Sequence, residues 1–257
     1  MTGQTSINWA TMTWNPLAGC TRVTTGCDHC YAYALHNRRH AAYLNHNGIN
    51  PKDGSRMPVQ YAKPFSEIQL FTKRLDDPLH VRTPQRFFVN SMSDLFHSDV
   101  PDAFIQQVFA TMHKARWHTF QILTKRPGRL KRVAPQLEWT PNIGIGVSIE
   151  NDVLTARANA LRDIPAGFRF LSCEPLLGPL PSLDLTNINW VITGGESGPG
   201  ARHCDPDWVR SIRDRCVAKG VAFHHKQWGG LRPESKGREL DGRTWEEFPE
   251  ITPAVRI

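Results

Sequence analysis

The chain has 257 residues, of which 40% are hydrophobic, and a formal net charge of +7. This length fits one large α/β barrel domain or two small domains. No run approaches the ~20 apolar residues that a membrane-spanning helix needs, and the polar start, Met1–Asn8, lacks the apolar core of a secretory signal. We therefore expect a cytoplasmic protein with no membrane partner. The positive charge favours nucleic acid or another anionic partner, although lysines and arginines scattered over a basic surface give the same total.

Short β-branched or aromatic runs alternate along the chain with polar loops and helical segments. Eight of these runs are predicted to be strands: Trp9–Trp14, Glu67–Phe71, Arg86–Asn90, His118–Leu123, Ile143–Val147, Phe168–Ser172, Trp190–Thr193 and Ala222–Lys226. Helices are predicted at His29–Leu44, 101–116 and 206–219, and residues 45–64 are expected to form a long loop. The last helix has the clearest ends, because Asp205 can cap its first turn and Gly220 can terminate it.

Alternating strands and helices predict a parallel sheet, and eight strands in this length favour a TIM-like (βα)8 barrel, full or partial. We expect the barrel domain to cover residues 1–230, with residues 231–257 as a charged, proline-bearing extension. In such a barrel, the chemistry gathers where the strands end. The polar and glycine residues that follow the predicted strands include Asn90, Ser91, Lys125, Glu150, Cys173, Glu174, Gly194, Gly195, Glu196 and Lys226.

Three of the six cysteines, Cys20, Cys27 and Cys30, lie within eleven residues. In a reducing compartment such crowding indicates metal or redox chemistry rather than disulfides. A [4Fe–4S] cluster normally takes four thiolates, so three leave one iron open to the amino and carboxylate groups of S-adenosylmethionine. One-electron cleavage of that cofactor would give a 5′-deoxyadenosyl radical. Two alternatives stay open: a zinc ion completed by His29 or His36, and three reduced structural thiols.

A series of short motifs runs in a fixed order through most of the chain. The motifs are Thr13–Cys20, Cys27–Ala32, Phe88–Phe96, Leu123–Pro127, Gly146–Glu150, Ser172–Leu177, Gly194–Pro199 and Lys226–Gly229. The series resembles the phage-type three-cysteine-motif family of bacteriophages and bacteria, which is regarded as radical S-adenosylmethionine-like. This resemblance implies an iron–sulfur enzyme of that type and a three-Cys-motif partner protein. The family is more distantly similar to spore photoproduct lyase-type DNA repair enzymes.

The cysteine spacing departs from that of most radical S-adenosylmethionine enzymes. Six residues separate Cys20 from Cys27 where those enzymes have three, and His29 stands where they have an aromatic residue before the last cysteine. A longer loop can still encircle a cluster, because Gly19 and Gly26 allow backbone angles that other residues avoid.

The resemblance, together with the residue types, suggests roles for the predicted site. Cys20, Cys27 and Cys30 are the expected iron ligands. Contacts to S-adenosylmethionine are expected from Tyr31, Asn90, Ser91, Glu150, Gly194, Gly195 and Glu196. Catalytic roles are expected for Cys173 as a hydrogen-atom donor, Glu174 as a proton carrier and Lys226 as an anchor for an anionic substrate. Simpler roles are also open: a buried packing thiol, ion pairs inside the mouth of the barrel, and a plain glycine turn.

Two hypotheses of different classes follow. In the first, the chain is a radical S-adenosylmethionine enzyme that modifies a nucleic-acid or nucleotide-like substrate. In the second, it is a non-enzymatic Fe–S or zinc module that binds nucleic acid or a partner protein. Formation of 5′-deoxyadenosine by the reduced, reconstituted protein separates them.

Overall fold

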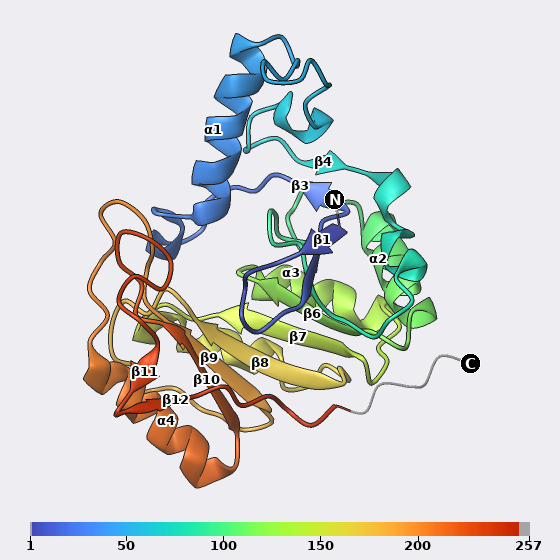
Figure 1. The fold of residues 1–257 in the computed structure, drawn as a ribbon. Helices are drawn as coiled ribbons and strands as arrows, with labels where there is room; N and C mark the ends of the chain where they lie inside the picture. Colours follow the sequence, from blue (N-terminus) through green and yellow to red (C-terminus); the bar gives the residue numbers. More distant parts are fainter. Residues whose placement is uncertain (1, 252–257) are drawn as a thin grey trace.

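The structure, a computed structural model, describes residues 2–251. An eight-stranded sheet with the order β1-β2-β5-β6-β7-β8-β9-β10 forms its centre (Figure 1). From β2 to β10 neighbouring strands run parallel, and β1 pairs antiparallel with β2 at one edge. The strands are β1 (Thr2–Gln4), β2 (Met12–Trp14), β5 (Arg86–Val89), β6 (Thr119–Thr124), β7 (Ile143–Ser148), β8 (Phe168–Cys173), β9 (Trp190–Gly194) and β10 (Ala222–Gln227). The prediction of an α/β fold with a mostly parallel sheet is confirmed.

Three helices form close to where they were predicted: α1 (Tyr31–Asn45), α2 (Asp102–Lys114) and α4 (Pro206–Lys219). A short helix that was not predicted, α3 (Pro127–Val133), is also present. Helix α4 ends as predicted: the Asp205 carboxylate accepts from the Asp207 N–H at 2.8 Å, and Gly220 has the left-handed φ of 65°. The 3₁₀ turns are η1 (Thr25–Cys27), η2 (Val59–Tyr61), η3 (Thr72–Arg74), η4 (Asp77–His80), η5 (Ala134–Gln136) and η6 (Asp152–Ala160).

The predicted strand at Glu67–Phe71 is wrong as a member of the main sheet. Only β4 (Gln69–Leu70) is extended there, and it pairs antiparallel with β3 (Leu17–Ala18) in a separate two-stranded sheet. A second small sheet joins β11 (Glu239–Leu240) to β12 (Arg243–Thr244). Strand β2 therefore pairs directly with β5, and residues 15–85 form an excursion between two neighbouring strands of the main sheet.

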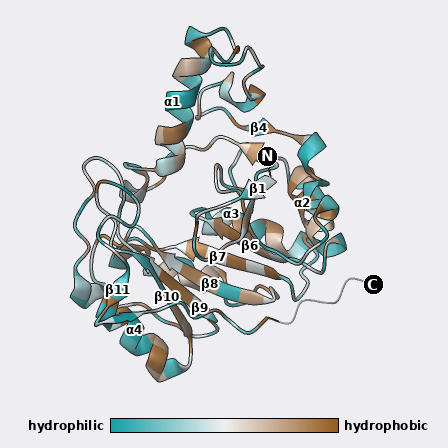
Figure 2. Ribbon diagram, viewed as in Figure 1, coloured by the Kyte–Doolittle hydropathy of each residue, from teal (hydrophilic) through white to brown (hydrophobic). Residues whose placement is uncertain are grey.

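Hydrophobic side chains cover both faces of the sheet, as expected for parallel strands. The ribbon of the central strands β6 and β7 is accordingly coloured mostly as hydrophobic in Figure 2. The larger cluster joins one face to α2, α3 and α4. The smaller cluster occupies the other face and consists of Trp9, Ala10, Phe88, Phe168, Phe170, Trp190 and Ile192. Glycines on β7 make room for it, because a Cβ on Gly144 would lie 2.1 Å from the Phe168 ring. Large rings from β8 thus fill the space that β7 leaves.

The two edges of the sheet approach each other without pairing as strands. Strands β1 and β10 end the strand order of the main sheet, and the outer edge of β10 pairs with residues 245–247 through the antiparallel bridge His224–Glu246. The Asn8 side chain, just before β2, donates to the Lys226 carbonyl at 3.1 Å and lies 3.0 Å from His224 Nε2, both on β10. Trp9 and Trp190 meet edge to face at 6.2 Å. The sheet is therefore strongly curved, and the (βα)8 barrel stays a prediction.

Residues 231–251 pack back onto the sheet. Leu240 and Trp245 are buried, and the Trp190 indole N–H donates to the Glu247 carbonyl at 2.9 Å. The predicted domain boundary at residue 230 stays a prediction, and its extension, residues 231–257, ends with residues 252–257 outside the described part of the chain. No helix within residues 2–251 is long and apolar enough to cross a membrane.

Candidate functional site

The cysteine loop, residues 19–30, connects β3 to α1 at the edge of the sheet where the parallel strands end (Figure 1). Cys20, Cys27 and Cys30 are half-buried, and none forms a disulfide. Cys30 occupies the N-cap position of α1, at the positive end of the helix dipole. The loop therefore brings three free thiols to the carboxyl edge of the sheet.

Two glycines let the loop pack closely against its neighbours. Gly19 has φ +100°, and a Cβ there would lie 2.3 Å from the Glu67 carbonyl oxygen. A Cβ on Gly26 would lie 2.5 Å from Glu150 Cγ. Any larger residue at either position would push the loop away from the body of the protein.

Glu150, which follows β7, lies directly beneath the loop and is fully buried. One of its carboxylate oxygens accepts from Thr24 Oγ1 at 3.0 Å and forms an ion pair with Lys125. The other oxygen pairs with Arg157 at 3.2 Å. These partners satisfy the buried charge, so Glu150 anchors the loop instead of presenting a free carboxylate to a cofactor.

Arg202 fastens the opposite side of the loop to the turn after β9. Its guanidinium forms hydrogen bonds to both carboxylate oxygens of Glu196, including Nε to Oε2 at 2.9 Å, and Nη2 also donates to the Thr25 carbonyl at 2.9 Å. Burial alone would raise the pKa of Glu196, but the hydrogen bonds and charge of Arg202 outweigh it and lower the pKa. Glu196 therefore stays ionised and committed to Arg202.

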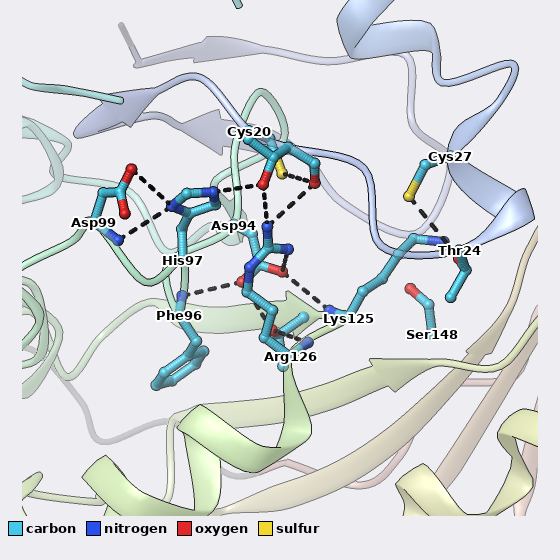
Figure 3. Close-up of polar contacts among 12 residues, drawn as sticks. Cys20, Thr24, Cys27, Asp94, Phe96, His97, Asp99, Lys125, Arg126 and Ser148 are labelled. Atoms are coloured by element: carbon cyan, nitrogen blue, oxygen red, sulfur yellow. Dashed lines mark hydrogen bonds and ion pairs between the residues drawn. The ribbon is translucent and has the colours of Figure 1, made fainter. Parts of the chain in front are cut away.

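A second polar group surrounds Cys20 (Figure 3). Asp94, after β5, accepts from Thr124 Oγ1 at 2.7 Å and from the Lys125 N–H at 3.1 Å, and Arg126 lies 3.6 Å from it. The guanidinium of Arg126 also donates to Thr21 Oγ1 at 2.8 Å, beside Cys20. The loop is thus tied at Thr21, Thr24 and Thr25 to acid–base pairs after three different strands.

Burial and neighbouring charges shift the pKa of the Cys20 thiol. Burial raises the pKa of Cys20 to about 12, Asp94 adds to the rise and Arg126 opposes it. The charges of Cys30 and Cys27 raise it further, so both lie within electrostatic reach of Cys20. As placed, however, no three His, Cys, Asp or Glu side chains within residues 2–251 converge tightly enough to hold a metal ion.

The two histidines considered for a zinc site point elsewhere. His36 is buried on α1, where its Nε2 lies 2.9 Å from the Lys63 carbonyl and its ring packs between Tyr61 and Phe65. The His29 ring faces the β9 turn, since a Cβ on Gly200 would lie 3.2 Å from His29 Cε1. Neither arrangement supplies a fourth ligand beside the thiols.

Tyr31, Asn90 and Ser91 come together where α1 starts. The Tyr31 hydroxyl donates to the Ser91 carbonyl at 2.7 Å, which fixes the first turn of α1 to the loop after β5. Asn90 adopts a left-handed φ of 66°, and its amide donates to Ser93 Oγ at 2.9 Å. The side-chain oxygen of Asn90 is buried without a hydrogen-bond partner. This unpaired acceptor is available to a bound molecule.

Sequence comparison places the chain in a family. The family described as "Protein of unknown function (DUF5131)" matches residues 4–249. The chain belongs to this family. No curated protein sequence matches the DUF5131 chain significantly.

Among solved structures, the DUF5131 chain is similar to "Spore photoproduct lyase complexed with dinucleoside spore photoproduct". The identity is 12% and the TM-score 0.46, over 80% of this chain and 61% of that chain. The DUF5131 chain therefore spans less than two thirds of the length of that solved chain.

Glu174 and Lys226 form a second ion pair at the same edge of the DUF5131 sheet. Lys226 Nζ lies 2.7 Å from Glu174 Oε1, and Gln227 donates to the same oxygen at 3.3 Å. Both charged side chains keep some exposure, 17% for Glu174 and 20% for Lys226. Gly194 packs against the carboxylate, because a Cβ there would lie 3.0 Å from Glu174 Cδ. This accessible pair can hold or transfer a proton.

Cys173 lies apart from this group. Successive residues of a strand point to opposite faces, and the Cys173 thiol belongs to the large core cluster on the helix-covered face. Complete burial raises its pKa, and Cys216 of α4 adds to the rise. Gly195 is likewise structural, since a Cβ there would lie 2.2 Å from the Trp228 carbonyl oxygen. No contact supports the predicted hydrogen-atom donation by Cys173.

Several residues of the DUF5131 site were not among the predicted site residues. They are Thr21, Thr24, Arg157 and Arg202. Asp94 and Arg126 follow predicted strands, so the sequence already places both in the polar set at the strand ends. Arg157 and Arg202 lie in segments with no motif of their own, and only the folded chain shows that they pair with buried carboxylates.

Proposed function

We propose that the chain binds a [4Fe–4S] cluster through Cys20, Cys27 and Cys30 and is a radical S-adenosylmethionine-like enzyme acting on a nucleic-acid or nucleotide-like substrate. The observation that carries this proposal is the anchored loop. It presents three free thiols at the carboxyl edge of a parallel sheet, with Cys20 within electrostatic reach of the other two.

The chemistry of the donor set fits such a cluster. Three thiols and no nearby fourth cysteine leave one iron open, whereas a structural zinc site needs four ligands. Thiolates at the N-terminus of α1 and beside Arg126 gain from positive charge that would offset the cluster's negative charge. Loading requires the three side chains to turn toward one another while the backbone anchors at Thr21, Thr24 and Thr25 hold.

When bound, the cluster and S-adenosylmethionine would supply one-electron cleavage of the sulfonium. The protein's own residues would orient the reactants. The unpaired Asn90 oxygen can accept from an ammonium or hydroxyl group, and Tyr31 is tied to the carbonyl of the next residue, Ser91. Lys226 can hold an anionic group of the substrate, and Glu174 can accept a proton from the substrate or return one to it.

Glu150 and Glu196 take positioning roles in this proposal. Both are buried and fully engaged by arginine or lysine, so they act on the reaction through the loop. Gly194 and Gly195 provide close packing against Glu174 and Trp228. We further propose that the curved sheet is a partial (βα)8 barrel of radical S-adenosylmethionine type. A three-Cys-motif partner protein remains an expectation from the resemblance.

The test is anaerobic reconstitution followed by iron and sulfide analysis. The wild-type chain should bind about four irons per chain and show the absorbance of a [4Fe–4S] cluster. Cys20→Ser, Cys27→Ser and Cys30→Ser should each lose most of that iron, while Cys204→Ser, at a buried cysteine outside the loop, should retain it. Stoichiometric zinc with no iron would contradict the cluster.

The enzymatic part of the proposal is tested on the reconstituted protein with reductant and S-adenosylmethionine. Formation of 5′-deoxyadenosine is expected, and Lys226→Met should not abolish it when no substrate is present. A stable cluster without any 5′-deoxyadenosine under several reductants would contradict the enzyme and leave a non-enzymatic Fe–S module.

A further inference from the structure

Residues 31–74 form an arm that comprises α1, η2, β4 and η3. Helix α1 and the loop after it stand away from the main sheet (Figure 1), whereas η3 returns to it, because the Trp14 indole of β2 donates to the Arg74 carbonyl at 2.7 Å. The arm contains seven lysines and arginines but two acidic residues, Asp53 and Glu67. The cations are Arg38, Arg39, Lys52, Arg56, Lys63, Lys73 and Arg74. All four tyrosines of the chain also lie here, at Tyr31, Tyr33, Tyr43 and Tyr61. Most of the chain's excess positive charge is therefore concentrated on one projecting segment.

The arm differs from the rest of the protein in how its charges are paired. In the described part of the body, about half of the lysines and arginines form ion pairs with acids, as in Arg129–Asp102 and Arg210–Asp241. In the arm, as far as the structure describes the chain, Lys63–Glu67 at 3.1 Å is the only such pair. Exposed cations without an internal partner interact strongly with an external polyanion, because no intramolecular contact must be broken first.

The unpaired cations of the arm project into solvent. Arg38, Lys52, Arg56 and Lys73 are exposed and form no ion pair with a described carboxylate. Arg39 is held in place on the Tyr61 ring, 5.2 Å from its centroid, and keeps its charge at the surface. Arg38, Arg39, Lys52 and Arg56 come from α1 and from the loop that follows it, whereas Lys73 lies in η3.

The arm begins at the candidate site. Tyr31, at the first turn of α1, is 51% exposed and is tied to the Ser91 carbonyl. Arg22 of the cysteine loop lies over the Tyr33 ring at 4.8 Å, which carries the positive charge from the arm to the loop. The exposed ring of Tyr31 suits stacking on a nucleobase. A strand bound along the arm would thus lead to the site.

We infer that the arm, residues 31–74, is a binding surface for the phosphate backbone of a polynucleotide. The inference deepens the proposed function by making its substrate a nucleic-acid strand instead of a free nucleotide. The binding itself depends on charge and shape alone and needs no cluster. It can therefore hold even where the proposed chemistry fails.

The test uses the full chain without cluster reconstitution, so that failure of cluster chemistry cannot affect it. Fluorescence anisotropy with labelled DNA of about 30 nucleotides, single-stranded and duplex, is recorded from about 50 to about 300 mM salt. The arm variant is Arg38→Gln/Lys52→Gln/Arg56→Gln. The matched control is Arg82→Gln/Lys114→Gln/Lys219→Gln, which removes the same charge from exposed residues that precede strands, at the opposite edge of the sheet.

The wild type should bind at least one of the two DNA forms with affinity that falls as salt rises. For single strands, the arm variant should bind at least tenfold more weakly, and its slope of log affinity against log salt should be smaller by about two, since each lost phosphate contact contributes about 0.7. The control should stay within about twofold of wild type in affinity. Circular dichroism checks that both variants keep the fold.

Three results would overturn the inference. The first is equal weakening by the arm variant and the control, which would make net charge alone responsible. The second is that polyglutamate displaces the labelled DNA as well as unlabelled DNA of the same charge does, which would show no preference for nucleic acid. The third is arm-dependent binding of vesicles containing anionic phosphatidylglycerol with no binding of DNA, which would assign the arm to a membrane surface.

Discussion

Arg202 contacts more of the candidate site than any other single side chain described above. Its guanidinium forms a bidentate contact with the Glu196 carboxylate, donates to the Thr25 carbonyl and lies 3.9 Å from Asp28. One side chain therefore connects the cysteine loop to the β9 turn. Glu196 is 5% exposed and cannot regain water if this partner is removed. A lysine could not replace the fork, because its ammonium cannot reach two carboxylate oxygens and a carbonyl in one plane.

Replacing Arg202 by Met should therefore destabilise the chain and loosen the cysteine loop. We expect the unfolding free energy to fall by about 2–4 kcal/mol, because Glu196 is left charged, buried and unpaired. Urea denaturation measures this loss, and maleimide labelling of Cys27 and Cys30 should become faster. The control is Arg210→Met, whose pairs with Asp207 and Asp241 are exposed and screened by water, so its loss should change stability far less. Equal destabilisation by the two variants would refute the special role of Arg202.

At the scale of elements, the cysteine loop packs closely against the end of β7, and Gly26 makes this packing possible. The backbone at Gly26 lies so near Glu150 that a methyl group would overlap its side chain. Glu150 cannot retreat easily, because Lys125 and Arg157 hold both of its oxygens. The loop must move instead.

Gly26→Ala should accordingly cost about 1–3 kcal/mol of unfolding free energy, the usual cost of overpacking a buried site. It should also increase solvent exposure of Thr24 and Cys27, detected by faster hydrogen exchange in the peptide that spans them. Gly128→Ala provides the comparison, since it lies within α3 with nothing within 4 Å of its Cβ position. That change should be neutral or stabilise by up to about 1 kcal/mol. A neutral Gly26→Ala would show that the loop is not packed as described.

Strand β10 buries two neighbouring histidines, and both are neutral in the folded chain. Burial, followed by the positive charge of Arg238, lowers the pKa of His224 to about 3, and burial lowers that of His225 to about 4. In the unfolded chain both would titrate near pH ~6.5. Above that pH neither state carries the extra proton, so the histidines leave stability unchanged there.

As pH falls below ~6.5, the unfolded chain takes up protons that the folded chain refuses, and stability is lost until the folded-state pKa values are reached. The loss should be about 1.4 kcal/mol per pH unit for each histidine. Urea unfolding of wild type and His225→Gln, compared from pH ~7 to ~5, should give a shallower pH dependence for the variant. His46→Gln, at an exposed position, should reproduce the wild-type slope. Parallel curves for wild type and His225→Gln would contradict burial of a neutral His225.

At the scale of the whole chain, the sequence predicted elements better than contacts between them. Runs such as Phe87–Val89 and Trp190–Ile192 are apolar on both faces, so they identified buried parallel strands, and Asp205 and Gly220 marked both ends of α4. Residues 67–71 were misassigned because a two-residue ladder with β3 has the same local pattern as a strand of the main sheet.

The site was predictable only in part for a similar reason. The cysteine spacing is local and therefore visible in the sequence, whereas the contact from Arg202 to Thr25 joins residues 177 positions apart. The carboxylates Glu150 and Glu196 were recognised as part of the site, but their arginine partners, Arg157 and Arg202, could not be named. A carboxylate after a strand gives the same sequence signal whether it is free to bind a ligand or already forms an ion pair within the protein.

The curvature of the whole sheet depends on how its two edges meet, and Asn8 is the residue that joins them. Its amide donates to the Lys226 carbonyl and its oxygen faces His224 Nε2 at 3.0 Å, so one side chain satisfies two groups on β10. Asn8→Ala should lower the unfolding free energy by about 1–3 kcal/mol, since both groups are left without a partner in a buried setting. Hydrogen exchange should quicken in β1, β2 and β10 together, although β10 is far away in sequence. Asn45→Ala, at the exposed end of α1, should leave exchange in all three strands unchanged. If exchange quickened in β1 and β2 alone, the edges would open independently and Asn8 would not hold the sheet in its curved form.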